Sequence, residues 1–399
     1  MPFHSATLLA LVGTLTVVYW LAPWQRLRLW LLLAASLVIY AWRHPPSLAL
    51  LLGSIAFNYG WGRLLERRPE KRLLAAGVAL NLSSLLYFKY SAFIVAQLPV
   101  ELPPPSPWMP LGISFFTFQV IAYLVDVYKK EIPAERSLLV FAVFKAFFAQ
   151  LVAGPIVRGK DFLPQLREKR PLDYGNLHAG VVLVLAGLFL KVGVADLLAQ
   201  HVEHAWSDVN GLATNAAWLA MYGYAAQLLA DFCGYSTMAV GFGLLFGLTL
   251  PANFIHPYGA ASLREFWRRW HVTLSTWLRD YLYIPLGGNR RNPELNRLLT
   301  MTLGGLWHGA GWSFVLWGFL HGVWLGVEQR LPRLPRAVGV AVTFHVVALL
   351  WVPFRAPSLA SALDFTRRLF APPYAWKTNL ATQFVVVTVA FLVLQGVWF

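Results

Sequence analysis

This chain of 399 residues has little cysteine and few acidic residues. It also lacks the common sequence motifs of soluble enzymes. Its one cysteine, Cys233, excludes an internal disulfide and a cysteine-based metal cage. The sequence has no Walker loop, G-x-S-x-G, H-E-x-x-H or recognisably spaced carboxylate pair, so an NTPase, a serine hydrolase and a zinc protease are unsupported. Charged residues make up only 13% against 58% hydrophobic residues, a balance that one soluble core cannot bury.

Long apolar runs account for this composition. Their lengths suit helices that cross a bilayer, and they are continuous rather than alternating, which favours helices over barrel strands. We therefore predict an all-α, polytopic integral membrane protein with about 10–13 membrane segments, some of them broken or re-entrant. The clearest runs are residues 3–21, 27–42, 48–65, 73–90, 177–198, 337–354 and 380–399.

The 33 basic residues outnumber the 18 acidic ones and give a net charge of +15. A charge of this size can indicate nucleic-acid binding, but here the basic residues lie in short loops between apolar runs, as the positive-inside rule describes. We expect membrane lipid as a partner and no nucleic acid. Arg355, Arg367 and Arg368 fall on the predicted outer side and do not follow this rule.

Two apolar segments do not fit simple crossings. Residues 138–152 are short and have basic loops at both ends, so we expect them to dip into the membrane or lie at its interface, surrounded by protein or by a cavity open to the cytoplasm. Residues 218–250 are too long for one crossing, and we expect the segment to be broken at 231–236, where Asp231 faces a cavity or a partner.

The stretch 254–322 organises the chain, because it contains two histidines among aromatic residues and glycines. Aromatic residues recur at helical spacing in 262–283, which predicts an amphipathic interfacial helix with His271 in its middle. Glycines interrupt 298–325, which predicts a hairpin or bent helix pair with His308 near its deep end. We predict one membrane domain, 1–399, with N-terminal spans in 1–98, a core in 111–330 and C-terminal spans in 337–399.

A histidine beside a membrane cavity can act as a general base, because its ordinary pKa lies near neutrality. Gly304, Gly305 and Gly309 would let a substrate approach the His308 ring closely. The alternatives for His308 and His271 are catalysis or a hydrogen-bonded structural role. The other histidines, such as His321, have no comparable setting, and we expect structural or surface roles for them. We predict no metal centre.

Several motifs give the sequence a strong resemblance to the membrane-bound O-acyltransferase family, over about residues 85–321. They are REFWRRWHVTLSTWLRDYLYIPLGGNR, LGGLWHGAGWSFVLWGFLHG, MPLGISFFTFQVIAYLVDVYKK, LVAGPIVRGKDFLPQL and DFCGYSTMAVGFGLLFGLTLPANFIHPY. The sequence looks most like the bacterial branch that contains alginate O-acetylation and D-alanine transfer proteins. It departs from alginate-type relatives at Cys233 and Thr237, where they usually have Ser and Asp.

This resemblance implies a helical ring around a cytoplasm-facing funnel, with His308 in the essential position and His271 as the second family histidine. It implies acyl transfer at a multi-pass site in the bacterial inner membrane. The acyl donor would be acetyl-CoA or a phosphopantetheine-linked acyl carrier protein, and no cofactor would stay bound. An extracytoplasmic SGNH-hydrolase-like protein would be the partner that esterifies a cell-envelope or exported polysaccharide. D-alanyl transfer toward teichoic-acid-like polymers, or a transporter without covalent chemistry, are the alternatives.

The resemblance and the local chemistry together suggest which residues bind the substrate. Arginines 264, 268, 269, 279, 290 and 291 would bind a phosphate-bearing donor or, alternatively, anchor the chain to anionic lipid. Trp307, His271 or backbone amides would stabilise an oxyanion. The predicted substrate-binding residues are Trp307, Trp270, Asp231, Tyr235, Arg268, Arg269 and Asn289.

Overall fold

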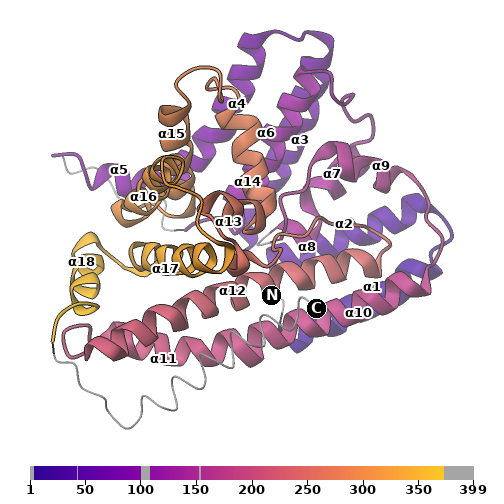
Figure 1. Cartoon of the computed structure of the whole chain (residues 1–399). Helices are drawn as coiled ribbons and strands as arrows, with labels where there is room; N and C mark the ends of the chain where they lie inside the picture. Colours follow the sequence, from indigo (N-terminus) through magenta and orange to yellow (C-terminus); the bar gives the residue numbers. More distant parts are fainter. Residues whose placement is uncertain (1–3, 43, 100–107, 152–153, 373–399) are drawn as a thin grey trace. The chain divides into compact units, whose positions relative to one another are not determined.

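The computed structural model describes residues 4–42, 44–99, 108–151 and 154–372 (Figure 1). Throughout these ranges the regular structure is helical, so the predicted all-α class is confirmed. The predicted run 380–399 lies outside the described residues.

Two compact units make up the chain, one formed by residues 1–185 with 235–252 and the other by 186–234 with 253–399. Two helices are divided between the units: α10 (Tyr174–Leu188) and α12 (Thr214–Leu245). The first unit otherwise contains α1 (Ala6–Leu21), α2 (Gln25–Ala41), α3 (Pro45–Arg67), α4 (Lys71–Leu85), η1 (Leu86–Tyr90), α5 (Ser91–Val95), α6 (Ile113–Tyr128), α7 (Leu138–Ala146), α8 (Phe148–Leu151) and α9 (Gly159–Arg167).

The second unit contains the remaining elements (Figure 1). They are η2 (Phe189–Ala195), α11 (Asp196–Ser207), η3 (Pro257–Gly259), α13 (Leu263–Arg269), α14 (Val272–Leu278), η4 (Arg279–Tyr283), α15 (Pro293–His308), α16 (Trp312–Glu328), α17 (Arg336–Arg355) and α18 (Leu359–Arg368).

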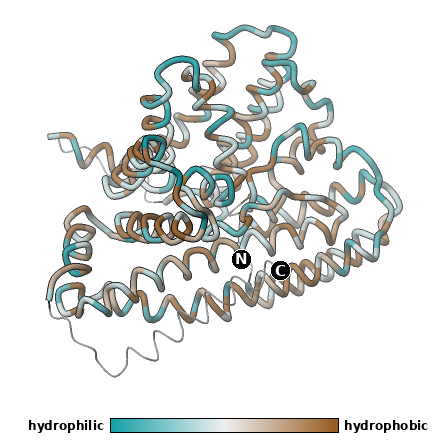
Figure 2. Tube along the Cα trace, viewed as in Figure 1, coloured by the Kyte–Doolittle hydropathy of each residue, from teal (hydrophilic) through white to brown (hydrophobic). Residues whose placement is uncertain are grey.

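Among the described residues, four helical runs are long and apolar enough to cross a membrane: Lys71–Val95, Tyr174–Ser207, Thr214–Leu245 and Arg336–Arg355. Hydrophobic residues predominate along α10 and α17 (Figure 2). The predicted runs 73–90, 177–198 and 337–354 fall within these helices. The run 3–21 corresponds to α1, which is apolar but has only 16 residues.

The short segment predicted to dip into the membrane is broken and enclosed by protein. It forms α7 and α8, which meet at Phe147, and Phe141, Phe144 and Phe147 are fully buried. The Phe148 amide, freed at the break, donates to the Ser36 hydroxyl at 3.1 Å. Irregular backbone at membrane depth needs such partners, since lipid cannot supply hydrogen bonds.

The predicted break at 231–236 is wrong, because α12 is continuous through it. Asp231 has its partner on a neighbouring helix, where Lys191 Nζ lies 2.7 Å from the Asp231 carboxylate and 2.6 Å from that of Asp196. Gly234 serves close helix packing rather than a break, since a Cβ there would lie 2.8 Å from the Gly187 carbonyl oxygen. The sequence did not show that Lys191 lies beside Asp231. A helix can continue through a carboxylate whose charge such a cation compensates.

An aromatic core holds the second unit together. Trp270, Trp317 and Trp351 are buried and pack on one another, with ring centroids 5.0 Å apart for Trp270 and Trp351 and 5.5 Å for Trp317 and Trp351. The Trp351 indole donates to the Tyr258 hydroxyl at 3.2 Å, and that hydroxyl donates to the Ala225 carbonyl at 2.8 Å. These contacts join η3, α12, α13, α16 and α17 around the two candidate histidines.

Candidate active site

His308 is the last residue of α15, and a short turn leads from it into α16. The two helices pack closely against each other, so the predicted hairpin is confirmed. Its glycines have a different role from the one predicted. A Cβ on Gly305 would collide with the Phe314 carbonyl, and one on Gly309 would collide with the Phe314 ring. Close packing between the helices, rather than open access for a substrate, therefore requires these glycines.

His271 lies at a break between two short helices, so the prediction of one amphipathic helix over 262–283 is wrong. Its backbone is left-handed, with φ 43° and ψ 55°, between α13 and α14. An adjacent loop holds this conformation: the Val272 amide donates to the Asn253 carbonyl at 2.9 Å, and the Thr273 hydroxyl donates to the Asn253 side chain at 2.7 Å. A left-handed non-glycine residue costs free energy and persists where the surroundings impose it.

The two histidines lie on either side of Trp307. The Trp307 ring is centred 5.0 Å from the His308 ring and 6.2 Å from the His271 ring. His271 is buried, with 1% of its surface exposed, whereas His308 is partly exposed. Burial lowers the pKa of the His271 imidazole well below its usual range, and nearby His308 acts in the same direction. His271 is therefore neutral near pH 7, and His308 is the histidine of the pair that keeps exposed surface.

Aromatic residues that the sequence reading did not single out complete the surroundings. The Trp317 and Phe354 rings are centred 5.2 Å and 5.3 Å from the His308 ring, both near perpendicular to it. Phe232 packs edge-on against His271 at 4.6 Å. His321, expected to be structural, is buried, and its Nδ1 accepts a hydrogen bond from the Trp267 indole at 3.3 Å. Phe232 and Phe354 come from helices far from His308 in the sequence, so no local pattern identifies them.

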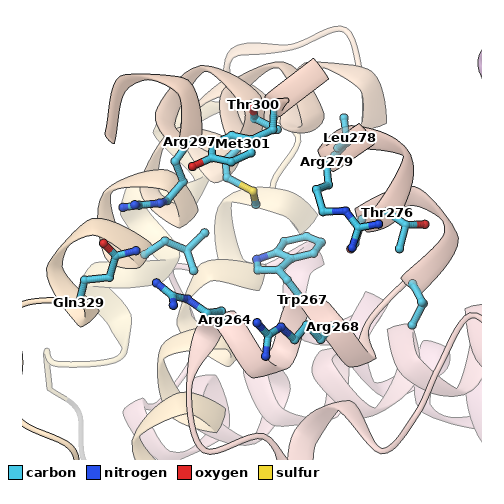
Figure 3. A pocket seen from close by; sticks show the side chains of 14 residues that line it. Arg264, Trp267, Arg268, Thr276, Leu278, Arg279, Arg297, Thr300, Met301 and Gln329 are labelled. Atoms are coloured by element: carbon cyan, nitrogen blue, oxygen red, sulfur yellow. The ribbon is translucent and has the colours of Figure 1, made fainter. Parts of the chain in front are cut away.

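A pocket of about 360 Å³ in the same unit gathers four arginines (Figure 3). They are Arg264, Arg268, Arg279 and Arg297. Among the described residues Arg279 pairs with Asp280 at 2.6 Å, while no carboxylate pairs with the other three. Three of them belong to the predicted phosphate-binding set, and Arg297 is an addition that lies on α15.

Trp267 connects this pocket to the histidines. It lines the pocket, and its ring is centred 5.8 Å from that of Trp317, which in turn packs on His308. Met301, two turns before His308 on α15, lines the pocket as well. An aromatic layer, formed by the Trp267 and Trp317 rings, therefore lies between the arginine pocket and His308.

The other predicted site residues lie in different surroundings. Trp270 is buried in the aromatic core, and Arg269 pairs with Glu265 at 2.5 Å. Asn289 is exposed and accepts a hydrogen bond from Tyr283 at 2.7 Å. Tyr235 belongs to the first unit, where its hydroxyl lies 3.4 Å from His4 Nδ1. Asp231 is bound to Lys191 as described above.

Comparison with known proteins identifies the family of this chain. The sequence model of the membrane-bound O-acyltransferase family matches residues 128–355. The chain is 41% identical to a probable alginate O-acetylase AlgI of Pseudomonas aeruginosa, over 87% of this chain and 70% of that protein. It is 39% identical to the peptidoglycan O-acetyltransferase of Helicobacter pylori (84% and 72%) and 29% identical to a teichoic acid D-alanyltransferase of Streptococcus thermophilus (61% and 68%).

The chain is therefore a membrane-bound enzyme that transfers acyl groups. The chain belongs to the membrane-bound O-acyltransferase family and is an O-acyltransferase. This membership decides against the alternative of a transporter without covalent chemistry.

Proposed function

We propose that this protein moves acetyl groups from a cytoplasmic thioester to a hydroxyl acceptor, for O-acetylation of a cell-envelope or exported polysaccharide. It would work as a multi-pass protein of the bacterial inner membrane, with an extracytoplasmic SGNH-hydrolase-like protein as partner. The observation that carries this proposal is the partly exposed His308 beside the buried His271, in a chain whose more similar relatives are named as O-acetylases.

In the proposed reaction, His308 removes the proton from the acceptor hydroxyl as that oxygen attacks the thioester carbonyl carbon. The tetrahedral intermediate then collapses, the carbon–sulfur bond breaks, and the proton held by His308 passes to the leaving thiolate. Ester and thiol are the products, and the histidine is regenerated. His271 lies on the other side of Trp307, where burial keeps its imidazole uncharged. In this reaction His308 is therefore the histidine that takes up and releases the proton.

The arginine pocket supports coenzyme A as the carrier of the acetyl group. Guanidinium groups bind phosphate through two parallel hydrogen bonds, and coenzyme A has several phosphate groups where a phosphopantetheine arm on a carrier protein has one. The guanidinium groups of Arg264, Arg268 and Arg297 form no ion pair with a carboxylate among the described residues, so they can pair with a ligand. Trp267 places this pocket next to the aromatic layer around His308.

Removing one pocket charge should weaken donor binding without changing the chemical step. For Arg297→Gln and Arg264→Gln we expect KM for acetyl-CoA to rise about 10-fold with kcat nearly unchanged, since each charge-assisted hydrogen bond contributes about 1.5–3 kcal/mol. Initial rates in membrane vesicles measure both constants. Arg290→Gln is the matched control, because Arg290 is exposed and does not line the pocket. An unchanged KM in both variants would favour lipid anchoring instead.

The function itself is tested by ester analysis of cells that lack this protein. We expect base-labile acetate on the envelope polysaccharide to disappear and to return when the gene is restored. Inverted membrane vesicles, which expose the cytoplasmic face, should incorporate label from radioactive acetyl-CoA. Loss of D-alanine esters with unchanged acetate would replace this proposal with D-alanyl transfer, the activity in the name of the less similar relative.

A further inference from the structure

Two partly exposed phenylalanines, Phe354 and Phe314, lie close to His308. Phe354 packs on the His308 ring at 5.3 Å and on Phe314 at 5.2 Å. His308, Phe314 and Phe354 are all partly exposed, whereas Trp317 and Trp351 behind them are each only 1% exposed. The partly exposed aromatic neighbours of His308 are therefore the two phenylalanines, and Phe354 packs on the two buried tryptophans.

These rings have little freedom to move aside. The Phe354 ring centroid lies 5.0 Å from that of Trp317, with 60° between the ring planes, and 5.2 Å from that of Trp351, with 75° between them. Phe314 lies directly over Gly309, where any Cβ would collide with it. Interlocked aromatic side chains pack as densely as a crystal, so displacing one requires its neighbours to shift as well.

The reacting carbonyl must come within reach of the hydroxyl that His308 deprotonates, so the first carbons of the acyl chain lie beside these rings. An acetyl group extends only one methyl beyond its carbonyl. A butyryl group extends two further methylenes, which must either displace an aromatic ring or move the carbonyl away from His308.

We propose that Phe314 and Phe354 set the size of the acyl group and restrict transfer to acetyl. This inference rests on the proposed function, because it requires His308 to act beside the thioester. Each methylene that a pocket must accommodate or reject changes kcat/KM by roughly 10- to 200-fold. We therefore expect wild type to use acetyl-CoA at least about 100-fold better than butyryl-CoA.

The test compares labelled acetyl-CoA and butyryl-CoA in inverted membrane vesicles that contain the native acceptor system. Base-labile label in the polysaccharide fraction gives kcat/KM for each donor. Phe354→Ala should lower the ratio of acetyl to butyryl kcat/KM by about 10-fold or more, chiefly by raising the butyryl rate. Phe354→Leu and Phe314→Leu are smaller changes that preserve packing if the alanine variant folds poorly. Phe344→Leu is the control, since Phe344 lies on the same helix but packs on Tyr258 and Tyr222.

The outcomes separate this inference from the function on which it rests. A wild type that transfers butyryl as fast as acetyl overturns the size limit and leaves the acyltransfer function intact. A ratio that stays at the wild-type value in Phe354→Leu and Phe314→Leu, at normal protein levels, overturns the assignment to these two rings. Wild-type vesicles that transfer label from neither thioester overturn the proposed function, and the size limit with it.

Discussion

Replacing His308 with alanine should lower acyl-ester formation about 10²- to 10⁴-fold, the usual contribution of a general base. The reason is that His308 is the histidine of the pair that solvent reaches, while His271 is buried behind Trp307. The measurement is the rate at which membrane vesicles form base-labile ester from labelled acetyl-CoA. Because His308 ends α15 and is partly exposed, its truncation should leave the amount of protein in the membrane unchanged.

Two controls separate chemistry from structure at this position. His308→Gln keeps a hydrogen-bonding side chain but cannot take up a proton near neutral pH, so it should be as inactive as the alanine variant. His345→Ala removes an exposed histidine of the same unit whose Nδ1 lies 2.7 Å from the Ala341 carbonyl of its own helix, and should keep wild-type activity. Wild-type ester formation by His308→Gln would remove general-base catalysis from this residue.

The membrane helices were predictable because the hydrocarbon of a bilayer offers the backbone no hydrogen-bond partners. An apolar run of crossing length must satisfy its own hydrogen bonds, and the predicted runs 73–90, 177–198 and 337–354 all lie within helices. The hairpin around His308 was predictable for a related reason, since glycines and an aromatic-histidine pair interrupt an apolar segment. Both inferences needed only neighbouring residues.

The errors arose where distant residues decide the local structure. Periodicity predicted one helix through His271. Instead, Asn253 accepts hydrogen bonds from Val272 and Thr273, which follow His271, and these bonds hold His271 in a left-handed conformation. The carboxylate of Asp231 suggested a broken helix, but Lys191 on another helix compensates its charge. Phe354 contacts His308 from a helix well beyond the recognised motifs. Such contacts exist only after folding, so periodicity and motif spacing cannot show them.

Gly305→Ala should unfold the enzyme at a clearly lower temperature and reduce ester formation, although alanine favours helix by about 1 kcal/mol over glycine. The new Cβ would collide with the Phe314 carbonyl and lie 2.9 Å from the Gly318 backbone, and neither is a side chain that can turn away. Forcing extra volume into a packed interface costs about 1–3 kcal/mol and sometimes more, so the steric effect exceeds the gain in helix propensity. The strain lies one turn before His308.

Gly304→Ala is the matched control, one residue earlier on the same helix. Its Cβ would lie 3.1 Å from Leu278 Cδ1, the end of a flexible side chain that can move by a few tenths of an ångström. Propensity then dominates, and the unfolding midpoint of purified protein in detergent, at one fixed scan rate, should stay the same or rise. Equal midpoints for the two variants would mean that α15 and α16 can separate at little cost, and that His308 does not depend on their close packing.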